Sequence, residues 1–286
     1  MFIELKKTTF SFWGYMMQNQ VYDIRTSEAA LNTLVSLTGV DPSVWKALSD
    51  EEDHVPVTFD LLADTINTYG RFPSRLDELE MVYIHVTTSA NGCESIKKHG
   101  IQDLATAYAN ADSELRVFLD EHDIHIDLEN RILTHAGREF DIAYRPCLQS
   151  PNDDDYWRKS VGKKFYNDHA TCGFFSVDNL RPYGGLVHMR PEVLNNIGHV
   201  VHLDLCLEWH SSHSPYEIIA RVKCRDIVYN NDTNEDELHQ YLYYLLMAYY
   251  NAFFEPSERI LLTKNNVRIL PQDVTRIAPI SFWNHL

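Results

Sequence analysis

The fold is decided by the segment YIHVTTSANGCESIKKHGI, residues 83–101 of the chain. Its first seven residues alternate between large apolar and polar side chains, which is typical of a strand. Ser89 or Asn91 is placed to cap the short helix that follows, and Gly100 is placed to end it. The predicted strand carries one histidine, His85, beside a cluster of hydroxyl groups. Because a core favours carbon at such positions, this polar cluster indicates a binding site.

The composition limits the class of protein. The chain has 286 residues, of which 44% are hydrophobic and 12% aromatic, so it can bury one large core or two small ones. A net charge of −16 argues against a broad nucleic-acid surface, which needs clustered Lys and Arg. The five cysteines form no CxxC pair, and their odd number is typical of a reducing compartment. We therefore expect a cytoplasmic protein with no secretory leader and no membrane-spanning segment.

Short apolar runs alternate with helical periodicity along most of the chain. The pattern predicts helices at residues 27–37, 59–69, 95–99, 104–121 and 235–254, and strands at 82–86, 124–126, 173–177, 200–207, 218–222 and 259–262. Helices do not follow each strand in turn, which favours an α+β fold over a doubly wound parallel sheet. We expect residues 1–80 to form a mostly helical region packed on the core. No P-loop or glycine-rich dinucleotide fingerprint is present.

Three segments far apart in the sequence carry residues suited to chemistry. The first is the His85 strand, the second is CGFFS at 172–176 with RPYGG at 181–185, and the third is SERILL at 257–262. Each has an ordinary structural explanation when taken alone. A histidine on a strand is often a satisfied core group, adjacent phenylalanines are core residues, and a glutamate after Pro-Ser is a surface or capping carboxylate.

Taken together and in this order, the segments resemble the ADP-ribosyltransferase-like superfamily. The similarity is to its diphtheria-toxin-like branch, which includes bacterial toxins that modify DNA, and it covers residues 82–280. It implies a split β-sheet core, a catalytic domain over residues 81–286, and NAD as the substrate. The chain departs from the family at Phe174, where a tyrosine is frequent, and the N-terminal region has no counterpart.

The resemblance implies a role for each matched residue. Glu258 and His85 would be the catalytic pair. Glu258 would hold a ribose hydroxyl and offset the positive charge of an oxocarbenium-like transition state. His85 would hydrogen-bond the adenosine-side ribose, and Tyr183 would stack on the cationic nicotinamide. The residues that the resemblance assigns to NAD binding are His85, Thr87, Phe174, Ser176 and Tyr183.

The expected function is that of an NAD-dependent ADP-ribosyltransferase, acting as a toxin or a defence effector. Its acceptor is a protein or a nucleic acid, and such a protein is expected to have an inhibitor or antitoxin partner. An NAD glycohydrolase, in which water replaces the acceptor, stays open as an alternative. So does a catalytically inactive acidic interaction protein on the same fold, which the charge of −16 favours.

Two further clusters have competing interpretations. Four histidines between residues 199 and 213 lie near Asp204 and Glu208, but their spacing matches no metal-binding motif, so we expect no metal. The segment 156–164 combines Tyr and Trp with four basic residues. It is interpreted as a solvated helix face that compensates the acidic loop before it, or alternatively as a phosphate contact.

Overall fold

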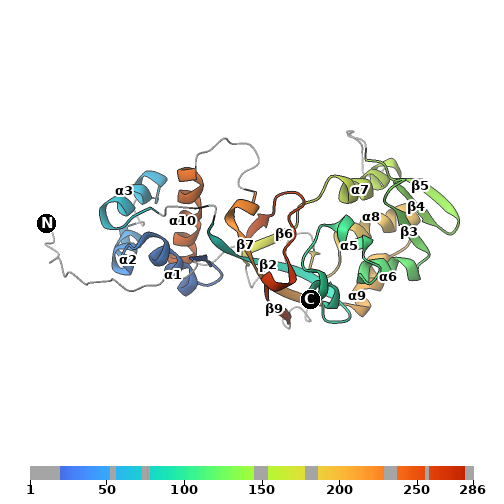
Figure 1. The fold of residues 1–286 in the computed structure, drawn as a ribbon, viewed down its shortest axis with the longest axis horizontal. Coiled ribbons are helices and arrows are strands. Elements are labelled where there is room, and N and C mark those ends of the chain that lie inside the picture. The colour runs from blue at the N-terminus through green and yellow to red at the C-terminus, as the bar shows by residue number, and fades with distance from the viewer. Residues whose placement is uncertain are drawn as a thin grey trace.

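The computed structural model describes residues 20–51, 56–72, 76, 78–144, 154–177, 186–228, 237–254 and 258–280. These residues form helices and largely antiparallel sheets, so the predicted α+β class is confirmed. Figure 1 shows three parts along the length of the molecule. A group of helices lies at one end, a six-stranded sheet in the middle, and a second group of helices with a three-stranded sheet at the other end.

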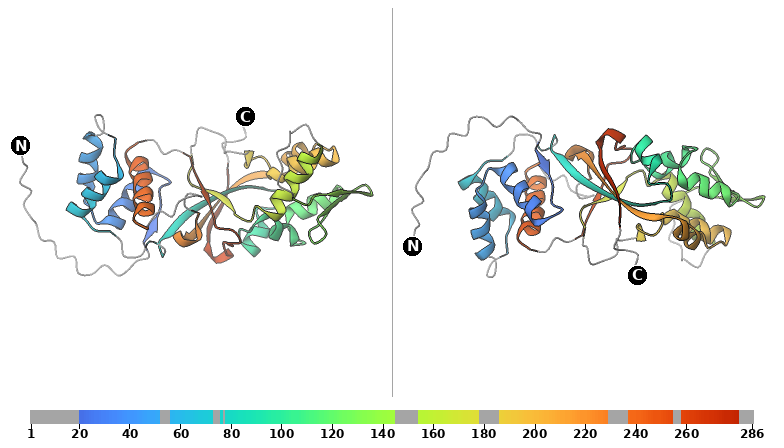
Figure 2. Two further views of the ribbon diagram at one scale, coloured as in Figure 1. Left: turned by 90° about the horizontal axis from the view of Figure 1, so that it is seen from above. Right: turned by 90° about the horizontal axis from the view of Figure 1, so that it is seen from below.

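Helices from both ends of the chain form the first part. They are α1 (Ser27–Thr38), α2 (Pro42–Glu51), α3 (Phe59–Tyr69) and α10 (Glu237–Phe253). The side chains of Thr26 and Thr58 accept hydrogen bonds from backbone N–H groups in the first turns of α1 and α3, which fixes the starts that the sequence predicts. All three N-terminal helices contact α10, and Figure 2 shows them beside it in both views. The expected boundary near residue 80 falls at the start of the central strand.

The central sheet has the strand order β8-β6-β2-β7-β9, with β1 pairing on β2 beside β6. Its strands are β1 (Val21–Tyr22), β2 (Glu80–Ser89), β6 (Cys172–Ser176), β7 (Ser214–Lys223), β8 (Arg259–Leu262) and β9 (Val274–Pro279). Only β1 runs parallel to its neighbour. The short 3₁₀ turns η2 (Cys224–Asp226) and η3 (Pro271–Asp273) follow β7 and precede β9.

The second group of helices is built from the middle of the chain. Its elements are α5 (Leu104–Ala109), α6 (Glu114–Glu121), β3 (Ile124–Asp127), β4 (Ile132–His135), β5 (Arg138–Asp141), α7 (Asp154–Tyr166), α8 (Glu192–Val201) and α9 (Leu205–Ser212). The strands β3, β4 and β5 form an antiparallel meander. The predicted helix 104–121 is broken in two, because Ser113 caps a new helix with its side chain on the N–H of Arg116.

The predicted strand at residues 200–207 is wrong, because the segment ends α8 and begins α9. The helical spacing of Val193, Ile197 and Val200 continues through Val201 and places these side chains on one buried face. His202 then ends the helix in the left-handed conformation at φ 59°. The short apolar run that suggests a strand therefore comes from two helix ends that meet at a turn.

The apolar side chains gather in two main cores. The α10 core lies between α10, the N-terminal helices and one face of the central sheet, and includes Tyr22, Trp45, Tyr83, Phe175 and Leu245. The α8 core lies within the second group of helices and includes Tyr108, Phe165, Leu194, Ile197 and Trp209. Within the described residues, no helix combines the length and apolar character needed to cross a membrane.

The two faces of the central sheet differ in how they are covered. Tyr83, Phe175 and Leu261 point into the α10 core. Ile84 and Phe174 are directly opposite each other in the β2–β6 register and belong to a small separate cluster on the other face. Because side chains alternate along a strand, His85 lies on the same face as Tyr83, towards the α10 core.

Candidate functional site

His85 occupies the middle of β2, where it is half-buried. Its ring Nδ1 lies 3.0 Å from the carbonyl oxygen of Cys172 on the neighbouring strand β6. A carbonyl only accepts hydrogen bonds, so Nδ1 carries the proton and donates. The ring is stacked with that of Tyr83, with centroids 6.4 Å apart and planes 10° from parallel. These contacts fix the orientation of the imidazole.

Burial lowers the pKa of His85 below its usual value, and the hydrogen bond to the Cys172 carbonyl offsets only part of that effect. The ring is therefore neutral near pH 7. With the proton on Nδ1, the other nitrogen, Nε2, is a hydrogen-bond acceptor. A fixed acceptor of this kind suits the hydroxyl group of a ligand.

The described parts of the three segments singled out in the sequence form three neighbouring strands. β8, which follows Glu258, pairs with β6, and β6 pairs with the His85 strand β2. The register places His85 across from Gly173, and Gly173 is paired with Leu261, three residues from Glu258 along the chain. Two strand spacings and three residues along a strand separate the Cα atoms of His85 and Glu258 by about 14 Å.

The two adjacent phenylalanines of β6 lie on opposite faces of the sheet. Phe174 pairs with Ile84 in the small outer cluster, whereas Phe175 enters the α10 core. The chain therefore brings Phe175, and not the expected Phe174, to the face that carries His85. Gly173 permits the close packing there, because a Cβ at this position would lie 2.4 Å from the Tyr83 ring.

The remaining expected binding residues have different surroundings. Ser176 is fully buried, and its hydroxyl accepts a hydrogen bond of 3.0 Å from the side-chain amide of Asn251 on α10. That contact ties the sheet to the helix and keeps Ser176 out of reach of a ligand. Thr87 is half-buried on the His85 face, opposite Tyr216 of β7. Tyr183 lies outside the described residues.

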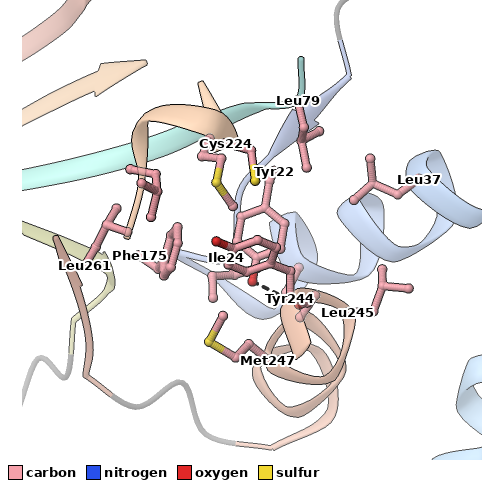
Figure 3. Packing of buried hydrophobic residues seen from close by; sticks show 14 of the residues in the cluster. Tyr22, Ile24, Leu37, Leu79, Phe175, Cys224, Tyr244, Leu245, Met247 and Leu261 are labelled. Atoms are coloured by element: carbon pink, nitrogen blue, oxygen red, sulfur yellow. Dashed lines mark hydrogen bonds between the residues drawn. The ribbon is translucent and has the colours of Figure 1, made fainter. Parts of the chain in front are cut away.

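Glu258 lines a cavity of about 390 Å³ between β8 and α10. Residues 258–261 form one wall, and Tyr243, Tyr244 and Met247 of α10 form the other. Phe175 closes the cavity from β6, and Val228 also contributes. Figure 3 shows Phe175 and Leu261 of the sheet on the side opposite Tyr244 and Met247. His85 is not among the lining residues.

Arg259 is the cationic group of this cavity. Its Nε is buried and has no hydrogen-bond partner among the described residues. Burial raises the pKa of the Tyr22 hydroxyl, and the positive charge of Arg259 acts in the opposite direction. The guanidinium charge is therefore directed towards the interior, as the burial of Leu261 and the 60% exposure of Ile260 along the same strand also indicate.

Comparisons of the chain with models of protein families, with curated proteins and with solved structures find no match. The function must therefore be argued from the residues and their geometry.

Sequence analysis missed the cavity residues other than Glu258. Arg259 follows Glu258 directly, and a charged residue that begins an apolar strand was a usable signal. Tyr243 and Tyr244 belong to an aromatic run of α10, which the sequence predicts only as a helix over residues 235–254. Nothing in the sequence indicated that this run faces the edge strand β8, because that contact depends on the fold.

Two of the four histidines between residues 199 and 213 stack on tryptophan rings. His199 stacks on Trp157 at 3.8 Å between ring centroids, and His213 stacks on Trp209 at 3.5 Å. Among the described residues, no three His, Cys, Asp or Glu side chains converge in a way that could hold a metal ion.

The basic residues of α7 are largely compensated by carboxylates. Arg158 and Lys159 form ion pairs with Asp155, and Lys164 forms ion pairs with Asp168 and Glu192. This arrangement agrees with the interpretation of the segment as a solvated helix face.

Proposed function

We propose that the protein is an NAD-consuming ADP-ribosyltransferase whose reaction centre lies at the junction of β8, β6 and β2. The supporting observation is that three segments separated by up to 173 residues, chosen from the sequence alone, form three adjacent strands (258 − 85 = 173). Glu258 at the start of β8 lines a cavity, and His85 on β2 is a fixed neutral acceptor.

In this reaction the bond between the nicotinamide nitrogen and the ribose C1′ breaks, and nicotinamide leaves as a neutral ring. The ribose becomes oxocarbenium-like, and a nucleophile of the acceptor forms the new bond to C1′ and releases its proton. The Glu258 carboxylate would stabilise the cationic sugar and accept a hydrogen bond from its 2′-hydroxyl. His85 would position the other ribose through Nε2.

The separation of about 14 Å between the Cα atoms of His85 and Glu258 suits one extended ligand that contacts both residues. Phe175, which shares a face with His85 and lines the cavity, is better placed than Phe174 to provide an apolar wall for the ligand. Tyr183 keeps its proposed role of stacking on nicotinamide.

The test is release of nicotinamide from NAD by the purified full-length protein, with and without cell lysate as a source of acceptors. We expect Glu258→Gln to fold normally and to lower turnover by about 10²- to 10³-fold, because one electrostatic contact in the transition state is lost. Glu129→Gln is the matched control, since Glu129 is an exposed carboxylate in the β3–β4 turn, and it should leave turnover unchanged.

The molecule that carries the label after incubation with tagged NAD distinguishes the possible reactions. Label bound to a macromolecule indicates transfer, and digestion with protease or nuclease then gives the acceptor class. Free ADP-ribose with no labelled macromolecule would assign the protein as a glycohydrolase. No nicotinamide release under either condition would contradict the proposal and favour the acidic interaction protein.

A further inference from the structure

The cavity between β8 and α10 is lined by a half-buried cation, Arg259, whose Nε–H is buried and has no partner among the described residues. Arg259 forms no ion pair with any described carboxylate, although Glu258 is its neighbour in the chain, and its Nε–H is buried without an acceptor. A buried N–H group without an acceptor is costly, so proteins normally pair such groups or use them to bind a ligand. Arg190 and Arg221 also bury an unpartnered nitrogen, but neither lines this cavity.

The other lining groups restrict what an anionic ligand can look like. The Glu258 carboxylate only accepts hydrogen bonds, so the ligand needs hydroxyl or amino donors at that end, away from its anionic group. Tyr243 is 38% exposed and contributes an aromatic ring to the lining, which suits a planar ring of the ligand. Phe175 and Met247 are buried and make the floor apolar.

The volume of the cavity sets an upper limit on the size of the ligand. About 390 Å³ is near the small end of the range for organic ligands, so it suits one ring system with a sugar and one phosphate, and not a whole dinucleotide. A net charge of −16 repels a long polyanion, which favours a small free ligand over a nucleic-acid strand.

We propose that this cavity binds a free nucleoside monophosphate, with its phosphate on Arg259, its sugar hydroxyls on Glu258 and its base against Tyr243. The site shares Glu258 with the proposed NAD reaction but goes beyond it, because binding of a mononucleotide requires no cleavage of NAD.

The experiment is isothermal titration of the full-length protein with AMP in the absence of NAD, compared with adenosine and with inorganic phosphate. AMP should bind about tenfold or more tightly than either, since both the charge-assisted contact and the ring contribute. Equal affinity for AMP and phosphate would overturn the role of the aromatic wall. Absence of AMP binding at millimolar concentration, or tighter binding of a 5′-phosphorylated oligonucleotide than of AMP, would overturn the proposal.

Single substitutions test the role that the proposal assigns to Arg259. Arg259→Ala should reduce AMP affinity about tenfold or more, to the level of adenosine, while Arg259→Lys keeps the charge and should retain part of the affinity. Arg268→Ala is the matched control, because Arg268 is exposed on the same C-terminal segment and lies outside the cavity. An Arg259→Ala protein that folds and binds AMP as tightly as the wild type would overturn the assignment.

Two further measurements test the sugar and the base. The preference of the wild type for AMP over 2′-deoxy-AMP should disappear in Glu258→Gln. Tyr243→Ala should weaken the binding of AMP and leave the binding of ribose 5-phosphate unchanged. Should the Arg259 variants fail to fold, the wild type alone decides. AMP should shift the methyl NMR signal of Met247 and leave that of Met189, outside the cavity, unchanged. Shifts of neither signal, or of both equally, would count against the site.

These binding assays and the NAD assay can fail separately. A protein that binds AMP through Arg259 but releases no nicotinamide would retain the mononucleotide site and lose the transferase proposal. A protein that turns over NAD but does not bind AMP would retain the transferase proposal and lose the mononucleotide site.

Discussion

The α10 core and the α8 core are built from different parts of the chain. The α10 core joins the two ends: the Tyr22 hydroxyl donates a 3.0 Å hydrogen bond to the carbonyl of Tyr244, and Asn251 donates one of 2.8 Å to the carbonyl of Ile24. The α8 core is assembled from stretches between residues 104 and 209, which lie between the strands β2 and β7. The first core therefore needs contacts between distant residues, and the second forms more locally.

The residues of the proposed reaction lie beside the α10 core and not beside the second group of helices. Glu258, Arg259 and Phe175 all lie on the side of the α10 core, and His85 faces the same way from the middle of β2. The α8 core is linked to the sheet near the other end of β2, where the Trp209 indole donates a 2.7 Å hydrogen bond to the Thr88 hydroxyl. The α8 core is therefore expected to loosen without disrupting the cavity.

Two matched truncations test this separation with the largest expected effect. Leu245 of α10 and Leu194 of α8 are both completely buried, so either change to Ala should cost about 2–5 kcal/mol through lost contacts and an unfilled cavity. Hydrogen exchange should show that Leu194→Ala accelerates exchange in α5 to α9 and leaves α1 and α10 protected. Leu245→Ala should accelerate exchange in α1 and α10.

Equal acceleration of α1, α10 and α8 in both variants would show one cooperative unit. In that case the two cores would be separate clusters of side chains and not separate units of stability, and the proposed independence of the cavity from the α8 core would fail.

Local pattern predicted most elements but not how they meet. Residues 59–69 were predicted as a helix and form α3, because Thr58 caps a segment with regular apolar spacing. The predicted strand at 200–207 is wrong, since two apolar helix ends joined at His202 give a short apolar run like that of a strand. A left-handed histidine at a helix end has no distinct sequence signal.

The candidate site was predictable to a similar extent. The sequence selected the three strands that become neighbours, but it did not decide which phenylalanine faces His85. That choice depends on the register of β6, which pairs Phe174 with Ile84 and is shifted by an irregularity between Phe174 and Ser176. The burial of Ser176 depends in turn on Asn251, 75 residues away along the chain.

The link between Trp209 and Thr88 gives a second, smaller test. Both side chains are buried, so Thr88→Val leaves the indole N–H without an acceptor and should cost about 1–3 kcal/mol. Trp209→Phe removes the same bond together with ring volume. In a double-mutant cycle by urea unfolding, the combined variant should cost less than the sum of the two single changes. Strict additivity would show that the bond does not hold β2 to the α8 core.

The smallest effect concerns pH, where the two regions should respond with opposite sign. His122, the C-cap residue of α6, lies with its Nε2 2.7 Å from the carboxylate of Glu208 on α9. Burial lowers the pKa of His122, but the hydrogen bonds with Glu208 and with the carbonyl of Phe118 outweigh this and raise it overall. His122 therefore stabilises the fold fully below its unfolded pKa of about 6.5, and this contribution is lost as the pH rises through the higher folded pKa.

His85 behaves in the reverse way, because burial lowers its folded pKa. Below about pH 6.5 the unfolded chain binds the proton more readily, so the contribution of the neutral His85 is complete above that pH and is lost as the pH falls. Two-dimensional ¹H–¹⁵N spectra of the imidazoles near pH 6.5 should show His85 mainly neutral, with its proton on Nδ1, and His122 mainly charged. Because Glu208 is 54% exposed, the pH-dependent part of the cost of His122→Gln should be only about 0.5 kcal/mol at acidic pH, and it should vanish at alkaline pH. A charged His85 at neutral pH would remove the acceptor on Nε2, and with it the proposed contact to a ribose hydroxyl.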